Sequence, residues 1–334
     1  MNDFFRFIII LVVGLSISSC SKSDSPIVQV PLRDYKEQFI TDSTTIDTYF
    51  KTHRMIVSAD GQYNVSFVSE TNIALSMRKL PHSYLKDTTV NEDGIDYKFY
   101  FVKFNEGTQK RPTQTDSVYV NYRGTILEDA STEFENSYNP VWFRLQELIT
   151  GWQHIFPSFK SGTYASSPPN GPTFTNFGAG VFFLPSGLAY YEQSQGSIPS
   201  YTPIAFSIKM CEVRYRDHDR DGVLSKDERK FLNATTATQW KENPLNTDTD
   251  ADGVPDLYDV DDDGDDILTK IEIKKPASDV TAGSTIGSGP SLYYPFNPSA
   301  TETKGIPSKP VNGVTDYTSP NRLRIHLDKT YKPL

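Results

Sequence analysis

The chain is poor in cysteine, with two among its 334 residues, and it has no run of about 20 apolar residues after the N-terminus. Two cysteines cannot build the disulfide framework that holds small secreted domains together. The missing apolar run means that nothing beyond the N-terminus is predicted to span a membrane. Phenylalanine (20) and tyrosine (19) are plentiful, which suits a β-rich fold with a deep apolar pocket. The length allows two or three compact units.

Basic residues are scarce in one segment. Between Asp217 and Glu272 there are 17 acidic residues against 6 basic ones, a local balance of −11, whereas the whole chain carries −9. The rest of the chain therefore sums to +2. Such concentrated acidity argues against a nucleic-acid partner and favours bound cations.

The N-terminus has the features of an export signal. Arg6 precedes an apolar stretch at 7–15 that is too short to cross a bilayer, and the sequence ISSC then ends at Cys20. This arrangement resembles the lipobox of bacterial lipoproteins, whereas an ordinary signal peptide would contain such a cysteine only by chance. The resemblance implies a signal peptide at 1–19, lipidation of Cys20 and a polar tether at 20–31.

Acyl chains on that cysteine would anchor the chain to a membrane, because each buried CH₂ contributes about 0.8 kcal/mol. We expect a cell-envelope lipoprotein of the outer membrane, on its periplasmic or its surface face. The outer membrane is favoured because Ser21, rather than aspartate, follows the cysteine. Only Cys211 then remains in the mature chain, and its strand-like surroundings predict a buried structural thiol.

The first module, predicted at 32–96, shows no chemistry. The pattern of residues 42–55 predicts a helix that begins at Asp42 or Ser43, and short strands are expected at 64–68 and 72–76. A dimerisation element, a spacer and an elaboration of the next domain remain open as its role.

From residue 97 the pattern changes to strands around one short helix, which predicts an α+β domain over 97–214. The expected strands lie at 97–104, 117–126, 141–145, 180–184 and 204–213. An acidic segment over 215–275 follows. The tail at 276–334 is rich in Pro, Ser, Thr and Gly, and we expect it to be irregular and laid over another domain.

Five short sequences in the middle third stand in a fixed order. They are VYVNYRG at 118–124, EFENS at 133–137, ELITGW at 147–152, LPSGLAY at 184–190, and IP at 198–199 with IAF at 204–206. In this order they resemble the FKBP family of peptidyl-prolyl isomerases over about 117 residues. The resemblance implies an antiparallel sheet wrapped on a short helix. It also implies the activity, with no cofactor required for the chemistry.

The resemblance further implies an apolar cup that holds a proline ring. Trp152 would form its floor, while the hydroxyl of Tyr190 and the backbone N–H of Ile149 would donate to substrate carbonyls. The complete set of implied site residues is Tyr122, Phe134, Glu135, Leu148, Ile149, Trp152, Tyr190, Ile198 and Phe206. The implied partners are proline-containing segments of exported proteins, with the membrane reached through Cys20.

The sequence departs from the family pattern at four positions. Glu135 replaces an aspartate, Tyr191 a glycine and Ser197 an isoleucine. Val141 aligns with a pocket aromatic, and the aromatic residues Trp142 and Phe143 are adjacent to it. Glu135, Val141 and Ser197 keep open a non-catalytic protein that binds a peptide or another partner in the same cup.

Three acidic ladders follow the sheet domain, and each alternates oxygen ligands as an EF-hand loop does. The first runs from Asp217 to Glu228 with Gly222 at its sixth position. The second begins at Asp248 and resembles a thrombospondin type 3 repeat, and the third begins at Asp261. The expected calcium ligands are Asp217, Asp219, Asp221, Val223, Glu228, Asp248, Asp250, Asp252, Val254, Asp259, Asp261, Asp263, Asp265, Ile267 and Glu272.

Ca²⁺ in a structural role is therefore expected, rather than a disordered acidic linker. In the third ladder, Asp266 stands where glycine belongs, and a left-handed backbone there is tolerable for aspartate at some cost. A calcium-dependent adhesive or assembly module remains a third alternative for the working part of the chain.

Overall fold

The computed structural model describes residues 32–128, 130–166, 171–228, 244–280 and 292–332. The predicted signal peptide at 1–19 and the predicted tether at 20–31, with Cys20, lie outside the described residues. The chain divides into a unit at Met1–Arg33 and a unit at Asp34–Leu334. Within the described residues no helix is both long enough and apolar enough for a membrane span.

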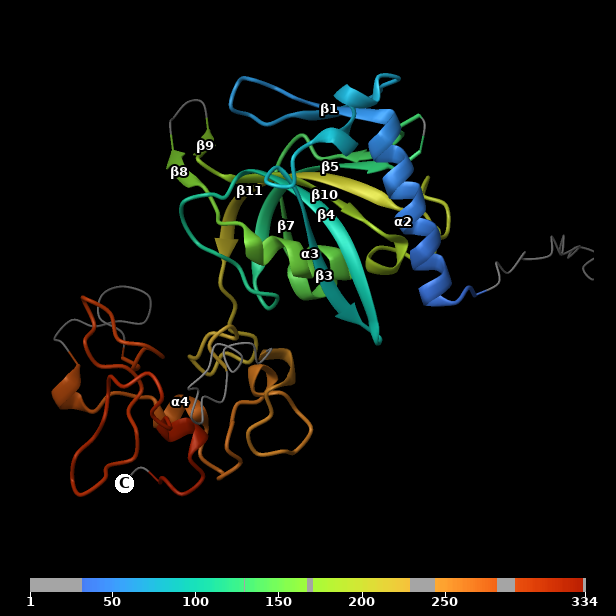
Figure 1. Ribbon diagram of the computed structural model, residues 1–334. Helices are drawn as coiled ribbons and strands as arrows, with labels where there is room; N and C mark the ends of the chain where they lie inside the picture. Colours follow the sequence, from blue (N-terminus) through green and yellow to red (C-terminus); the bar gives the residue numbers. More distant parts are fainter. Residues whose placement is uncertain (1–31, 129, 167–170, 229–243, 281–291, 333–334) are drawn as a thin grey trace, which may run out of the picture. The chain divides into compact units, whose positions relative to one another are not determined.

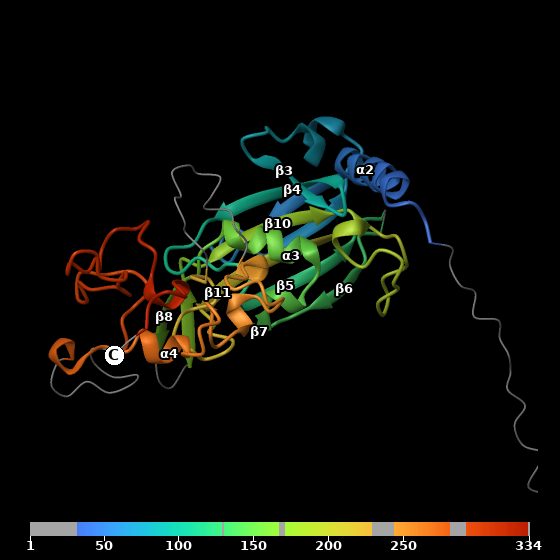
Figure 2. The ribbon, with the colours of Figure 1, turned by 90° about the horizontal axis from the view of Figure 1, so that it is seen from below.

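The centre of the second unit is an antiparallel sheet of seven strands. In the order β3–β4–β10–β11–β5–β6 each strand is hydrogen-bonded to the next, and β7 pairs with β5 (Figure 2). The strands are β3 (Leu85–Glu92), β4 (Ile95–Asn105), β5 (Ser117–Ile126), β6 (Glu133–Asn136), β7 (Val141–Arg144), β10 (Gly178–Leu184) and β11 (Ile204–Arg214). With one short helix on its face, this sheet confirms the predicted α+β class.

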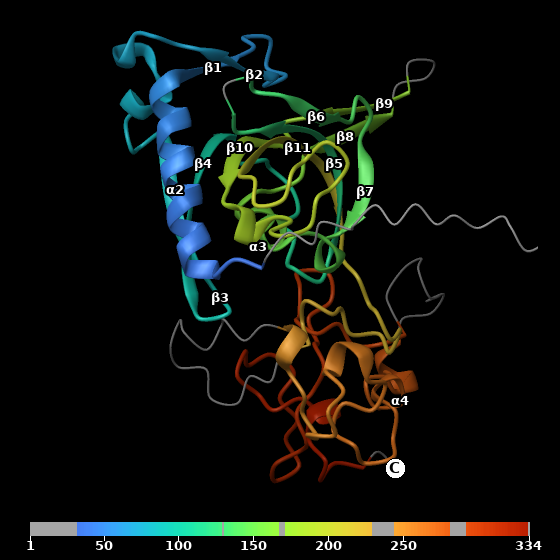
Figure 3. The same ribbon diagram turned by 90° about the vertical axis from the view of Figure 1, so that its right-hand side faces the viewer.

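One face of the sheet wraps the short helix α3 (Thr150–Ile155), as Figure 3 shows. Along β5 and β11, alternate residues such as Val120, Tyr122 and Phe206 join the core around α3. This follows from the pleat, which directs every second side chain to the same face. Every residue of β10 is buried, because helices cover both of its faces.

The opposite face is covered by the long helix α2 (Tyr35–Thr52) (Figure 1). Ile46 and Phe50 of α2 pack with Val181 and Phe183 of β10 in a second core. Apolar contacts on both faces of β10 thus stabilise the fold, because each face removes apolar surface from water.

The helix begins earlier than the sequence pattern predicts. Its N-cap is Asp34, whose carboxylate accepts the backbone N–H groups of Lys36 and Glu37. The predicted cap, Asp42, instead lies buried in the middle of the helix, where it accepts hydrogen bonds from Ser186 at 2.7 and 2.6 Å. The local pattern therefore placed the start of the helix too late, because Asp42 is of a residue type common at helix caps but binds a distant partner instead.

The segment at 32–96 does not fold apart from the sheet domain. Its helix shares a core with the sheet, and its last strand, β3, pairs with β4 along its whole length. Among its roles the elaboration of the sheet domain is the one observed. The strand expected at 64–68 corresponds to β2 (Val65–Ser69), which pairs with β1 (His53–Val57), whereas 72–76 contains a 3₁₀ turn at Ile73–Leu75.

A short hairpin and a compact C-terminal region complete the fold. The hairpin consists of β8 (Thr163–Ser166) and β9 (Pro172–Thr175). In the C-terminal region the helix α4 (Thr269–Glu272) follows the third acidic ladder. The tail is irregular as expected, and its apolar residues form a core together with the acidic segment. A core formed by the acidic segment and the tail contains Val223, Ile273, Tyr294, Phe296, Ile306 and Ile325.

Candidate active site and acidic loops

A cup of about 240 Å³ opens beside α3 on the concave face of the sheet. Strands β5, β6, β7 and β11, the helix α3, the turn before it and the turn at Tyr190 contribute to it, so that distant parts of the sequence meet there. Its lining residues are Tyr122, Glu135, Phe143, Glu147, Leu148, Ile149, Trp152, Tyr190 and Phe206. Seven of these nine residues belong to the set implied by the sequence.

Trp152 stands at the centre of the aromatic packing. The rings of Tyr122, Phe143 and Phe206 meet it at centroid distances of 5.2, 5.7 and 5.1 Å, all nearly perpendicular. Each edge-to-face pair contributes about 0.5–1.5 kcal/mol beyond the area it buries. The mutual contacts fix the ring orientations, and the cup is therefore a preformed apolar surface.

The indole N–H of Trp152 is buried and has no hydrogen-bond partner among the described residues. An orphaned donor of this kind costs about 1–3 kcal/mol in a folded protein. A phenylalanine would fill most of the same space without that cost, so the tryptophan is not explained by stability alone.

Two tyrosine hydroxyls face the cup in different situations. Tyr122 donates its hydroxyl to Glu135, whereas the hydroxyl of Tyr190 has no hydrogen bond to any of the described residues. Burial, and secondly the charge of Glu135, raises the pKa of Tyr190. Burial and the contact with Glu135 raise the pKa of Tyr122 as well. Both phenols consequently stay protonated at neutral pH and can act as hydrogen-bond donors.

The backbone of Ile149 offers another donor. Ile149 is the N-cap of α3, and its carbonyl accepts from the N–H of Trp152 at 2.9 Å. Its own N–H has no partner among the described residues, as is normal at the start of a helix. A carbonyl placed over the cup can therefore be bound from this side.

Phe143, which was not in the set of implied site residues, is the aromatic of β7 that lines the cup. Val141, which the alignment put in that place, is exposed, and Phe143 lies two residues further along β7 on the same face. Phe143 contacts both Trp152 and Tyr122. The period of two along a strand could have pointed to it.

Phe134 and Ile198 were also implied as walls, but they do not line the cup. Phe134 packs edge-on against Phe206 at 5.6 Å, and its ring lies against Gly124, where a Cβ atom would come within 2.3 Å of it. Ile198 is part of the core beneath. Both residues support the aromatic wall from behind.

The turn that carries Tyr190 is held by the N-terminal helix. Asp42 of α2 accepts from the backbone and the hydroxyl of Ser186, four residues before Tyr190. Tyr191 adopts a left-handed backbone with φ of 49°, and its ring stacks on Tyr35 at 4.1 Å. A glycine is common at such a φ because it lacks a Cβ atom. Here a tyrosine takes that position and ties the turn to α2.

Larger hollows occur elsewhere on the molecule. One of about 370 Å³ lies on the other face of β5 and β11 and includes Asn121, Arg123 and Lys209. Its polar and charged lining does not suit a proline ring. The smaller aromatic cup therefore fits the chemistry better than the larger hollow does.

The three acidic ladders share one backbone conformation. The fourth position has a positive φ in each loop (Arg220, Ala251 and Gly264), and so does the sixth (Gly222, Gly253 and Asp266). Asp266 thus adopts the left-handed backbone expected where glycine would stand. In each loop the first three alternating aspartates converge, with carboxylate oxygens within 4.8 Å of one another.

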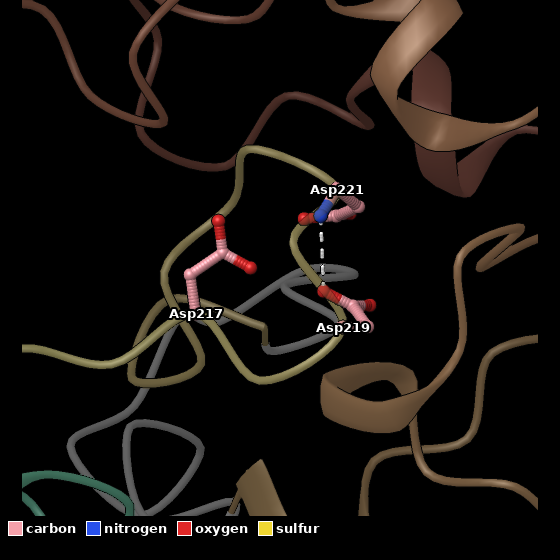
Figure 4. Close-up of side chains that lie close together, drawn as sticks. All are labelled: Asp217, Asp219 and Asp221. Atoms are coloured by element: carbon pink, nitrogen blue, oxygen red, sulfur yellow. Dashed lines mark hydrogen bonds between the residues drawn. The ribbon is translucent and has the colours of Figure 1, made fainter. Parts of the chain in front are cut away.

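The first loop is drawn in Figure 4. Asp217, Asp219 and Asp221 surround a common space, and the N–H of Asp221 donates to Asp219 at 3.1 Å. Glu228 is buried, and neither of its carboxylate oxygens has a hydrogen-bond partner within the part of the chain that the structure describes. Burial, followed by repulsion from Asp221, raises the pKa of Glu228 to about 10. Buried, unpaired carboxylates that converge in this way fit a divalent cation.

The third loop repeats this pattern. Both carboxylate oxygens of Asp263 and of Glu272 are buried and have no hydrogen-bond partner among the residues described. Burial, followed by repulsion from neighbouring acids, raises the pKa of Glu272 to about 9. In the second loop, Asp250 and Asp252 repel Asp259, the expected closing ligand, and contribute to its raised pKa after burial. The residues of all three loops therefore fit the expected ion.

Part of the sheet domain is similar to a known family of proteins. Residues 108–166 match the family model of FKBP-type peptidyl-prolyl cis-trans isomerases. The FKBP-type isomerase FkpA of Aeromonas hydrophila is 31% identical over 135 residues, which is 40% of this chain and 42% of that protein. FkpA of Escherichia coli K12 is 29% identical over 134 residues, 39% of this chain and 43% of that protein. The chain thus spans less than half the length of these curated relatives.

Two solved structures are also similar. A peptidyl-prolyl cis-trans isomerase from Pseudomonas syringae is 18% identical, with a TM-score of 0.32, over 55% of this chain and 98% of that one. FkpA from Escherichia coli is 25% identical, with a TM-score of 0.30, over 38% of this chain and 51% of that one. A second family model, described as BamM C-terminal, matches residues 218–305. It covers the acidic loops together with part of the tail, in agreement with their common core.

Proposed function

We propose that the chain is a peptidyl-prolyl cis-trans isomerase that assists the folding of exported proteins. The observation that carries this proposal is the aromatic cup, in which Tyr122, Phe143 and Phe206 surround Trp152 beside the free hydroxyl of Tyr190. The similarity of residues 108–166 to FKBP-type isomerases supports it.

The reaction needs an environment rather than a nucleophile. Rotation about an X–Pro bond faces a barrier of about 18–20 kcal/mol, because the amide must lose its resonance. In the twisted state the carbonyl has less charge separation, and an apolar cup solvates that state better than water does. The proline ring would pack on Trp152 while Tyr190 and the N–H of Ile149 hold the neighbouring carbonyls.

The clients would be proline-containing segments of exported proteins, with the domain held near a membrane through Cys20. Support for this location is the N-terminal sequence, which ends in ISSC after a short apolar stretch. Three residues, 32–34, separate the predicted tether from the helix α2, so a membrane anchor would be followed after a short polar segment by the helix that supports the turn of Tyr190.

The acidic loops would bind structural Ca²⁺. Each loop offers three converging aspartates, and the first and third also offer a buried glutamate with unpaired oxygens. Without a cation, these carboxylates repel one another at the cost of stability. Calcium would therefore hold the C-terminal region together rather than take part in the isomerisation.

The test is isomerisation of a short X–Pro peptide by the chain lacking residues 1–20, with calcium and with chelator. Two pairs of matched variants separate the cup from the rest of the surface. Trp152→Phe and Tyr190→Phe alter the cup, while Trp142→Phe and Tyr164→Phe make the same changes at exposed positions outside it.

We expect kcat/KM to fall about tenfold in each cup variant, the equivalent of one hydrogen bond or aromatic contact of ~1.4 kcal/mol in the transition state. The two control variants should retain the rate of the unaltered chain. A folded chain that binds the peptide without accelerating its isomerisation would instead identify a non-catalytic binding protein.

A further inference from the structure

Asp262 is a buried aspartate that the loop pattern does not use. Its side chain is 1% exposed, and neither of its carboxylate oxygens has a hydrogen-bond partner. A charged group in this position costs several kcal/mol unless a cation or a donor compensates it. No such donor is present among the described residues.

Its place in the chain separates it from the third loop. Asp261 and Asp263 occupy the first and third ligand positions of that loop and converge with Asp265. Asp262 stands between them at the second position, and its backbone N–H donates to the hydroxyl of Thr269 at 3.3 Å. The alternation that brings its neighbours to the third site therefore leaves Asp262 out of that site.

The acids that act on Asp262 belong largely to the first loop. After burial, the strongest influences on its carboxylate are the charges of Asp221, Asp256, Glu228 and Asp219. Of these four, Asp256 already accepts two hydrogen bonds from Thr249. The remaining three are expected ligands of the first calcium site.

Independent contacts place the first loop against the segment around the third. Val223 and Ile273 belong to one core, and the side chain of Ile273 lies 3.1 Å from the position of a Cβ on Gly222. The ammonium of Lys270 donates to the carbonyl of Arg220 at 3.3 Å. The two segments therefore pack together, which brings Asp262 within reach of the first site.

We infer that Asp262 is a further ligand of the ion in the 217–228 loop, so that this ion joins the first loop to the segment of the third. The inference rests on the proposed binding of calcium. It adds a carboxylate from outside the loop, and the number and charge of the ligands set the calcium affinity of such sites. The first site would then form only when both segments are folded.

The alternative is a buried carboxyl group that stays protonated and binds no metal. The two accounts differ in the expected effect of Asp262→Asn on stability in calcium. If Asp262 is a ligand, the substitution removes charge repulsion in chelator and removes a ligand of the ion in calcium. The variant should then be at least as stable as the unaltered chain in chelator, and less stable in calcium.

The experiment measures calcium binding by titration calorimetry and native mass spectrometry, and thermal unfolding with and without calcium. It uses the full chain in detergent and its Asp262→Asn variant. Asp96→Asn is the matched control, because Asp96 is an exposed acid of β4 outside the three calcium loops. We expect one of the calcium affinities to fall about 10- to 100-fold in Asp262→Asn, as for the loss of a metal-site partner. Asp96→Asn should leave every affinity unchanged.

A double variant locates the effect. If Asp262 and Glu228 hold the same ion, Asp262→Asn should change little when it is added to Glu228→Gln, since the first site is already weakened. Unchanged calcium affinities in Asp262→Asn, with three ions still bound, would overturn the inference alone. A full chain that binds no calcium would overturn both the inference and the proposed calcium sites.

Discussion

Replacing Asp42 by alanine should destabilise the sheet domain and slow isomerisation, although the residue lies outside the cup. Its carboxylate accepts from the backbone N–H and the hydroxyl of Ser186 at 2.7 and 2.6 Å and from the side-chain amide of Gln38 at 2.6 Å. All three residues are buried.

The magnitude follows from the donors that lose their acceptor. Each buried donor left unsatisfied costs about 1–3 kcal/mol, and the amide of Gln38 keeps a second acceptor in the carbonyl of Tyr201. The two donors of Ser186 therefore dominate, and we expect Asp42→Ala to lower the free energy of unfolding by about 3 kcal/mol. Asp42→Asn retains one acceptor oxygen and should cost about half as much.

The same helix provides the control. Asp47 makes surface ion pairs with Lys51 at 2.6 Å and Arg78 at 3.0 Å, and exposed pairs contribute only about 0–1 kcal/mol. Urea unfolding should therefore separate Asp42→Ala clearly from Asp47→Ala. The activity of Asp42→Ala, measured where it is fully folded, should also fall, because Ser186 positions the turn of Tyr190. Equal stability and activity of the two alanine variants would refute the reasoning.

Three further predictions concern other parts of the chain. Tyr191→Gly should relieve a left-handed φ, but it loses the ring stack on Tyr35 and adds chain entropy to the unfolded state. The free energy of unfolding in urea should therefore fall by about 1 kcal/mol, and a gain in stability would contradict this. Chelation of calcium should lower the melting temperature of the C-terminal region, as measured by calorimetry. About 10 mM calcium at a site with a dissociation constant of about 1 mM contributes about 1.4 kcal/mol to stability. A melting temperature that does not change with calcium would count against the sites. Burial, and secondly Arg324, lowers the pKa of His326 to about 3. Because the folded pKa lies below the unfolded one, stability is lost as the pH falls below about 6.5, by about 2 kcal/mol between pH 7 and pH 5. The unaltered chain should show this loss in excess of His326→Phe when the two are unfolded at each pH. Parallel curves of unfolding free energy against pH would exclude it.

Local patterns predicted the sheet well. The strand expected at 117–126 is β5 itself, and the other expected strands of the sheet differ by a few residues at their ends. Alternation along a strand is a short-range signal, and burial on one face enforces it. The backbone of the acidic loops was likewise predictable, because positive φ at Gly222 and Asp266 follows from the ligand ladder itself.

The sequence was less informative where distant partners decide the structure. Asp42 looks like a helix cap, but its partner Ser186 lies 144 residues away. The alignment assigned the pocket position to Val141 rather than to Phe143, because both residues are apolar. Only the packing of Phe143 on Trp152 shows which of the two lines the cup. Asp262 stood out only when its burial and its unpaired oxygens were visible. In each instance the deciding interaction joins segments that no short sequence window contains.

The central claim is that the aromatic cup accelerates prolyl isomerisation. NMR exchange spectroscopy on a short X–Pro peptide tests it most directly, because it measures the cis-to-trans and trans-to-cis rates at equilibrium. A catalytic amount of the calcium-loaded chain should raise both rates without changing the cis fraction, and Trp152→Phe should lower both about tenfold while Trp142→Phe does not. Peptide signals that shift on binding while the exchange rates stay at their uncatalysed values would contradict the claim.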